Sequence, residues 1–167
     1  MAKGFNAVVP KLDAMAGKDI GSLLKTTGMT LVSTVGGSAG PLYGTAFMKA
    51  GAVLKDKMEI GSQELVLALE AAIGGIKMRG KATTGEKTML DAICPAYDAM
   101  KAAVDAGEDM KSAVAKAVEA ARAGVEYTKT IKATKGRASY IGDRSIGHQD
   151  PGATSALYML EVLLEQI

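Results

Sequence analysis

Two arginines, four glycines and an Asp-Pro-Gly step fall within residues 136–155, and these residue types together suit the binding of an anion. Asp150 is a favourable helix N-cap and Pro151 a favourable first helical residue, so we expect a helix to begin there. The start of a helix offers free backbone N–H groups and a partial positive charge, to which Arg137 and Arg144 would add guanidinium groups. The stretch therefore predicts a site for a phosphate or a nucleotide. Spacing alone leaves open an alternative, in which the helix start is only structural and the arginines are solvated.

The residues between 136 and 149 show neither helical nor strand periodicity, which predicts a long ordered loop that leads into the final helix. Loops of this length are usually either functional or disordered. We expect order, because Tyr140, Ile141 and Ile146 are available as apolar anchors. The loop is interpreted as a lid or floor for an anionic ligand.

A second glycine-rich stretch covers residues 35–44 and contains Ser38 and Pro41. Its pattern resembles that of the final helix, with a glycine-rich turn, a hydroxyl group and a proline that is expected to open a helix. A turn without side chains lets a ligand lie directly on the backbone. The alternative is a tight connection between two helices, which this motif alone does not exclude.

Composition excludes several classes of partner. The chain has 167 residues, enough for one domain, and its formal net charge of +2 is too small to argue for nucleic acid or an anionic membrane surface. Tryptophan is absent and only two phenylalanines are present, which removes the usual platform for base stacking. No apolar run has the length of a membrane span and no signal peptide is visible, so a cytoplasmic protein is expected. The single cysteine, Cys94, fits a reducing compartment and is expected to be a buried, inert thiol.

No segment alternates apolar and polar residues, so the chain is predicted to be all-α, with about seven helices in an up-and-down antiparallel bundle or barrel. The expected helices cover residues 1–16, 19–35, 41–54, 63–78, a stretch from 88 onward, 109–127, and a stretch from 151 onward. Pro10 and Pro95 fall inside two of them and are expected to bend them. The longer loops 36–41, 80–88 and 136–152 follow alternate helices, so we expect them to gather at one end.

Three motifs carry a resemblance to a known family. GGSAGPLYG at 36–44, GKATTGEKTMLD at 80–91, and GRASY followed by GHQDPGAT between 136 and 154 together resemble the nucleotide-binding L subunit (DhaL) of dihydroxyacetone kinase. The last two motifs are specific, and the similarity extends over the whole chain. The chain is accordingly identified as a single DhaL-type nucleotide-binding domain over residues 1–167. The resemblance implies an antiparallel helical barrel, with one helix more in the family than is expected here, that holds ADP at one end.

The resemblance also implies an activity and partners. In the phosphotransferase-dependent systems, ADP is a tightly held coenzyme that a phosphohistidine-bearing M subunit rephosphorylates, and the resulting ATP phosphorylates dihydroxyacetone on a separate K subunit. Phosphoryl transfer depends mostly on positioning and electrostatics, so no catalytic nucleophile is assigned to this chain. Because the functional histidines belong to the other subunits, the only histidine, His148, is expected to be structural. A homodimer is possible.

Carried over position by position, the resemblance places nine residues around the nucleotide: Ser38 and Ala39 by the phosphates, Gly80, Thr88 and Met89 around the nucleotide with Met89 near the base, and Arg137, Asp150, Pro151 and Gly152 completing the pocket. The Arg137 guanidinium and the backbone N–H groups near Pro41 are expected to balance the phosphate charge.

The chain departs from the family at its start. The family has an acidic loop whose carboxylates hold Mg²⁺ just before the helix that here begins at Met1, whereas Asp13 and Asp19 are isolated. No metal ligand is therefore assigned, and Mg²⁺ is expected only from the resemblance. We interpret the chain as N-terminally truncated and expect it to bind Mg·ADP more weakly than a chain with the acidic loop. An apolar seam along the first or last helix is expected to be covered by a partner chain.

Two alternatives remain open from the sequence. The first is the nucleotide-binding, C-terminal half of an ATP-dependent dihydroxyacetone kinase in one chain. The second is an inactive helical scaffold or regulator, in which the glycine-rich loops only connect helices.

Overall fold

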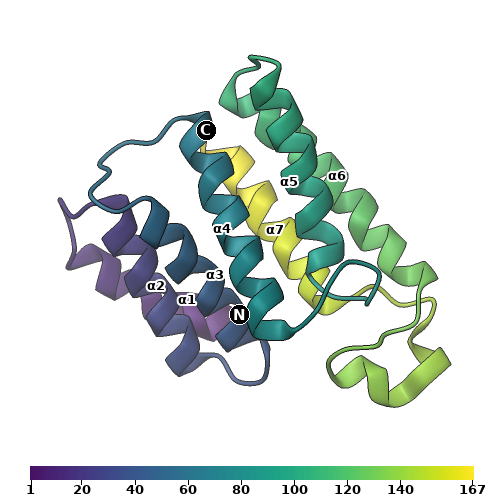
Figure 1. Ribbon diagram of the computed structural model, residues 1–167. Coiled ribbons are helices and arrows are strands. Elements are labelled where there is room, and N and C mark those ends of the chain that lie inside the picture. The colour runs from purple at the N-terminus through teal and green to yellow at the C-terminus, as the bar shows by residue number, and fades with distance from the viewer. The chain divides into compact units, whose positions relative to one another are not determined.

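The computed structural model describes residues 1–167 and contains seven α-helices, one 3-10 helix and no strand (Figure 1). The prediction of an all-α fold is confirmed. The chain forms two compact units, an N-terminal unit of residues 1–81 and a C-terminal unit of residues 82–167. None of the helices combines the length and the hydropathy that a transmembrane helix needs. The assignment of residues 1–167 to one domain stays a prediction.

The N-terminal unit consists of four helices, in which α2 packs on α1 and α3, and α3 packs on α4. Their bounds are α1 Ala2–Asp13, α2 Ile20–Thr34, α3 Ala39–Val53 and α4 Ser62–Gly80. Asp19 caps α2 by accepting a hydrogen bond from the backbone N–H of Ser22 at 3.0 Å, as its position predicts. Two expectations are corrected, because α3 begins two residues before Pro41 and α4 continues to Gly80, a residue that was expected in a polar loop.

Glycines allow the backbones of α2 and α3 to touch. A Cβ atom added to Gly21 would lie 2.6 Å from the carbonyl oxygen of Gly51, and one added to Gly28 would lie 2.5 Å from that of Gly44. These two pairs also show that α2 and α3 run antiparallel. Any larger side chain at these positions would separate the helices, so the glycines are required by packing rather than by turn geometry.

The C-terminal unit consists of α5 (Leu90–Asp105), α6 (Met110–Thr130), the 3-10 helix η1 (Arg137–Ser145) and α7 (Pro151–Gln166). Helix α6 packs on both α5 and α7 (Figure 1). The segment expected to be a loop is therefore partly 3-10 helix, which Gly142 interrupts with a φ of 60°. Short turns of this kind have no apolar repeat long enough to be recognised as periodicity.

The burial of Cys94 and an exposed apolar seam along the first or last helix were predicted from the sequence, and Cys94 and the last helix can be checked in the C-terminal unit. Cys94 is a free thiol but is only half-buried, whereas full burial was expected. Tyr158 and Val162, one turn apart on α7, are 60% and 55% exposed. Exposed apolar residues on the last helix agree with the expected seam, and a partner that covers it stays a prediction.

Candidate functional site

Helix α7 begins where the sequence predicts, with Asp150 as N-cap and Pro151 as first residue. The Asp150 carboxylate accepts a hydrogen bond from the N–H of Ala153 at 2.7 Å and another from the N–H of Gly152. Pro151 has no N–H, and the N–H of Thr154 donates to the Asp150 carbonyl at 3.0 Å. The expectation of free N–H groups at this helix start is therefore wrong, because the side chain of Asp150 already occupies them.

Burial of Asp150 raises the pKa of its carboxyl group, and the hydrogen bonds from Ala153 and Gly152 act in the opposite direction. The nearby Asp91 carboxylate also raises this pKa, while the Lys87 ammonium lowers it. Ionising Asp150 in the folded chain therefore costs more than ionising it in water. The carboxylate is held in place by its own helix and not by an ion pair.

Five of the predicted site residues lie at the starts of α5 and α7: Thr88, Met89, Asp150, Pro151 and Gly152. A Cβ atom added to Gly152 would lie 2.8 Å from the Asp150 Oδ2 atom and 3.4 Å from the Cβ of Met89. Met89 is the N-cap residue of α5 and its side chain is buried. The hydroxyl of Thr88 accepts a hydrogen bond from the N–H of Leu90 at 3.2 Å, so its predicted place near the helix cap is confirmed.

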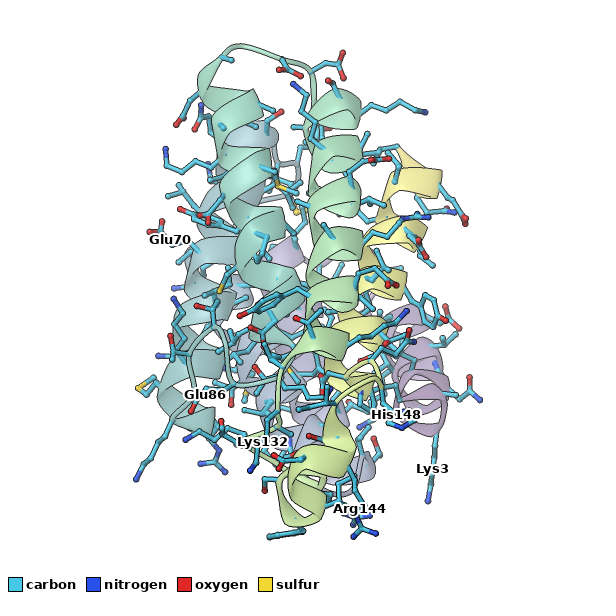
Figure 2. All side chains as sticks on the ribbon, turned by 90° about the vertical axis from the view of Figure 1, so that its right-hand side faces the viewer. Lys3, Glu70, Glu86, Lys132, Arg144 and His148 are labelled. Atoms are coloured by element: carbon cyan, nitrogen blue, oxygen red, sulfur yellow. The ribbon has the colours of Figure 1, made fainter.

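Arg137 is exposed at the start of η1 and has neither an ion pair nor a hydrogen bond, which leaves its guanidinium available to an anion. The apolar anchors expected for this segment are not anchors, since Tyr140 is 87% exposed and Ile141 and Ile146 are exposed as well. Figure 2 shows Arg144 at the outer tip of the segment.

Polar groups hold the segment in place of those apolar side chains. The buried hydroxyl of Ser145 accepts from the N–H of Ala133 at 2.9 Å and donates to the carbonyl oxygen of Gly142 at 2.7 Å. The hydroxyl of Thr128 accepts from the N–H of Asp150 at 2.9 Å. These bonds join the end of α6, the end of η1 and the start of α7 within the C-terminal unit.

Lys87 is the residue that sequence reasoning missed. It is only 3% exposed, and its ammonium donates to backbone carbonyl oxygens only: Thr128 at 2.5 Å, Ser145 at 2.7 Å, His148 at 2.5 Å and Ile131 at 3.3 Å. Burial lowers the pKa of this ammonium, and the Asp150 carboxylate opposes the shift. A lysine in a polar loop is normally solvated, so the only signal in the sequence was its place inside the 80–91 motif. His148 is exposed and accepts from Lys87 through its backbone carbonyl, and the structural role expected of its imidazole stays a prediction.

The start of α3 differs from that of α7. Its N-cap residue, Ser38, has helical backbone angles (φ −75°, ψ −24°), and its hydroxyl makes no capping hydrogen bond. The N–H groups of Ala39 and Gly40 therefore have no side-chain acceptor, while Pro41 has no N–H and that of Leu42 donates to the Ser38 carbonyl at 3.1 Å. Gly36 and Gly37 precede them, and a Cβ atom at either glycine would meet nothing within 4 Å. This is an open helix start that can accept an anion.

Gly80 lies at the same end of the N-terminal unit as Ser38. A Cβ atom added to Gly75 on α4 would lie 2.9 Å from Lys49 and 3.1 Å from Thr45 on α3, and these neighbouring helices run antiparallel (Figure 1). The last residue of α4 consequently lies at the end where α3 begins (Figure 1). After Gly80 the chain turns at Lys81, which has a left-handed conformation with φ 46°.

The residues present do not fit the Mg²⁺ that the resemblance implies. No three His, Cys, Asp or Glu side chains lie close enough together to hold a metal ion. The Asp19 carboxylate caps α2, as described above, and Asp13 is exposed at the end of α1. No step of the proposed chemistry is therefore assigned to a metal held by this chain.

Comparison with known proteins tests the family resemblance found in the sequence. A family model described as the DAK2 domain matches residues 1–165. The chain belongs to the DAK2 domain family. Within this family the chain is similar to DhaL subunits, because relatives with that name are 39–44% identical to it over nearly its whole length.

Two of these DAK2 relatives show the extent of the match. The PEP-dependent dihydroxyacetone kinase, ADP-binding subunit DhaL of Escherichia coli K12 is 44% identical over 163 residues, which are 98% of this chain and 78% of the relative. The PTS-dependent dihydroxyacetone kinase, ADP-binding subunit DhaL of Lactococcus lactis is 41% identical, and the match covers 100% of this chain and 79% of the relative. By name, both relatives are ADP-binding subunits of a dihydroxyacetone kinase.

Parts of longer proteins are also similar to this chain. The human triokinase/FMN cyclase is 36% identical over 143 residues, which are 86% of this chain and 24% of that protein. The crystal structure of the dihydroxyacetone kinase of C. freundii superposes with a TM-score of 0.70 at 25% identity, and the match covers 98% of this chain. The chain spans only 28% of the length of that solved kinase.

Proposed function

We propose that this chain is the ADP-binding subunit of a phosphotransferase-dependent dihydroxyacetone kinase. Bound ADP receives a phosphoryl group from a phosphohistidine M subunit, and the ATP so formed phosphorylates dihydroxyacetone on a K subunit. The observation that carries the proposal is the open start of α3 in a chain whose DhaL relatives are named ADP-binding. The proposal places the protein in the cytoplasm, where these partners would meet it, and allows a homodimer.

The start of α3 is proposed to bind the ADP phosphates. Unoccupied N–H groups and the partial positive charge of the helix start favour an anion there, and the Ser38 hydroxyl is free to donate to a phosphate oxygen. Ala39 contributes its backbone N–H, and the open glycines before it leave room for the ligand. Gly80 lies at the same end of this unit and presents backbone without a side chain.

For the C-terminal unit, nucleotide contacts are proposed on the basis of the family resemblance. Arg137 balances phosphate charge with its unpaired guanidinium, while Thr88 contributes to the surroundings of the nucleotide and Met89 lies near the base. Asp150 has a different role from that of a phosphate ligand, because its carboxylate is committed to α7. We propose that it fixes the backbone of Pro151 and Gly152, which then face the nucleotide.

No residue of this chain is proposed as a nucleophile. Transfer to and from ADP requires that donor, nucleotide and acceptor be aligned and that charge be stabilised, which positioned hydrogen-bond donors achieve. The nucleophiles in the proposal are an ADP phosphate oxygen and the hydroxyl of dihydroxyacetone. ADP and ATP are the cofactors.

The test combines binding with reconstitution. Calorimetry is expected to show that ADP binds, and Ser38→Ala is expected to weaken binding about tenfold, as for loss of one hydrogen bond to a charged group. Ser33→Ala is the matched control, because that exposed hydroxyl bonds only to the carbonyl of Thr30 at 3.0 Å on α2. Dihydroxyacetone phosphorylation should require K subunit, phosphorylated M subunit and this chain together. A wild-type chain that neither binds nor copurifies with ADP contradicts the proposal and favours the scaffold.

A second candidate is the nucleotide-binding part of an ATP-dependent kinase. The structural match to the C. freundii kinase, which has also been solved in complex with AMP-PNP and Mg²⁺, favours it. The two functions differ in the phosphate donor. Multiple turnovers from free ATP with K subunit, in the absence of an M subunit, would support this second function, whereas dependence on the M subunit supports the first.

A further inference from the structure

We propose that Lys87 is the positioning residue of the nucleotide site, holding residues 131–150 so that Arg137 can reach an anion. The inference rests on the proposed function, because it assigns a role to a residue that does not itself touch ADP. Its basis is the set of carbonyl contacts that the ammonium makes inside the C-terminal unit.

The four acceptors of Lys87 belong to three successive parts of the chain. Thr128 and Ile131 lie at the end of α6, Ser145 at the end of η1, and His148 in the turn before α7. One ammonium thus ties both ends of the segment that carries Arg137. Each acceptor is a neutral carbonyl, so the contacts depend on the geometry of the backbone and not on a mobile acidic side chain.

The loop that carries Lys87 is itself fixed. Lys87 has φ 60°, a left-handed conformation that is uncommon for a residue other than glycine. The buried Asp91 carboxylate accepts from the N–H of Gly85 at 2.5 Å and from the N–H of Thr88 at 2.7 Å, on either side of the lysine. An unusual backbone conformation held by a buried carboxylate aims the lysine into the C-terminal unit.

The other attachments of the segment are polar: besides the bonds of Ser145 and Thr128 described above, the N–H of Gly147 donates to the carbonyl of Lys129 at 2.7 Å and the N–H of Thr134 to that of Glu86 at 3.3 Å. Its large apolar side chains Tyr140, Ile141 and Ile146 are exposed, and the bridge from Lys132 to Asp143 at 2.9 Å is at the surface. Figure 2 shows Lys132, Arg144 and His148 at the same end of the C-terminal unit. Because so little apolar area is buried here, loss of the Lys87 contacts should free the segment without unfolding α5, α6 and α7.

The test compares Lys87→Met, Arg137→Ala and the double variant in the full chain, with ADP as the probe. Methionine keeps the length of the side chain but donates no hydrogen bond. Each single variant is expected to weaken ADP binding about tenfold, and the double variant should be no weaker than the weaker single one, because both remove the same contact. Independent structural damage would instead make the losses multiply, and multiplying losses would overturn the inference.

Hydrogen exchange without nucleotide gives a second readout. Lys87→Met should speed exchange across 131–150 and leave α2 and α3 unchanged, whereas the control Lys132→Met, which breaks only the surface bridge to Asp143, should change neither exchange nor ADP affinity. If Lys87→Met does not fold, Ser145→Ala, which removes the bonds to Ala133 and Gly142, should produce the same changes to a smaller degree. Unchanged exchange in a folded Lys87 variant overturns this inference alone, and a wild-type chain that binds no ADP overturns the proposed function.

Discussion

Helices α3 and α7 begin with similar sequences, but their first N–H groups differ in whether a side chain accepts hydrogen bonds from them. Each follows a glycine-bearing turn, has a polar N-cap residue and contains a proline in its first turn. At α7 the cap residue, Asp150, occupies the N–H groups of its own helix. At α3 the cap residue, Ser38, leaves them without a side-chain acceptor. A helix start can therefore be recognised from sequence, but whether it can receive a ligand cannot.

The difference lies in one backbone angle of the cap residue. Asp150 has ψ 128°, the extended conformation from which a side chain reaches back to the N–H groups two and three residues later. Ser38 has ψ −24°, a helical conformation from which its hydroxyl makes no such bond. Near Ser38, Gly40 lies close to the end of α2. A Cβ atom added to Gly40 would lie 2.1 Å from the carbonyl oxygen of Val35.

The strongest way to break the comparison is to give α3 the carboxylate that α7 has. Ser38→Asp places a negative charge where the ADP phosphates are proposed to bind, and affinity is expected to fall about a hundredfold, or ~2.7 kcal/mol. Calorimetry with ADP measures the loss. Ser33→Asp on the exposed face of α2 is the control for added charge, and equal losses in the two variants would refute a phosphate site at α3.

Adding one methyl group should affect the two starts unequally. Gly40→Ala meets backbone at 2.1 Å and is expected to lower the free energy of unfolding by about 2 kcal/mol, whereas Gly152→Ala meets the Asp150 side chain at 2.8 Å and should cost less than about 1 kcal/mol. Urea denaturation of both variants checks the order. A Gly152 variant less stable than the Gly40 variant would show that α7 has the tighter start.

Removing the cap of α7 should lower stability, while removing the hydroxyl of α3 should not. Asp150→Ala is expected to lower the free energy of unfolding by about 1 kcal/mol, and Asp150→Asn should restore most of this, since asparagine is also a good cap. Ser38→Ala should change stability by less than about 0.5 kcal/mol, because no capping bond is lost. If Ser38→Ala proved as damaging as Asp150→Ala in the same denaturation series, α3 would be capped in solution.

The smallest expected effect is the pH dependence of the Asp150 cap. Burial raises the pKa of Asp150 above its unfolded value of about 3.9, so the folded chain binds more protons between the two pKa values. The contribution of Asp150 to stability therefore falls as pH rises through that window and is constant above it. Asp19, the cap of α2, differs because hydrogen bonds from Ser22 lower its pKa. Its contribution is present above the unfolded pKa and is lost as pH falls through the lowered value.

Unfolding of wild type, Asp150→Asn and Asp19→Asn across acidic pH tests this contrast. The stability difference between wild type and Asp150→Asn should decrease with rising pH, and that between wild type and Asp19→Asn should increase. Slopes of the same sign for both variants would mean that the Asp150 carboxyl is not held in a buried environment.

The sequence alone determined the all-α fold, the start of α7 at Asp150 and Pro151, and the family motifs. These features depend on apolar periodicity and on hydrogen bonds between residues three or four apart, which local sequence records. Some predicted helix bounds were wrong because they also depended on local sequence. The polar residues around Gly80 predicted a loop, whereas α4 continues to Gly80.

Only the tertiary structure decided which groups at these helix starts are free and which are occupied. Lys87 is buried because carbonyl groups 41 to 61 residues away surround its ammonium, and no local pattern encodes that arrangement. Tyr140 and Ile141 are exposed, and polar bonds of Ser145 rather than burial of these side chains attach η1 to the rest of the unit. The conformation of Ser38 likewise accompanies the approach of α3 to the end of α2. Contacts between residues distant in the chain satisfy or expose polar groups, and sequence spacing does not show which of the two occurs.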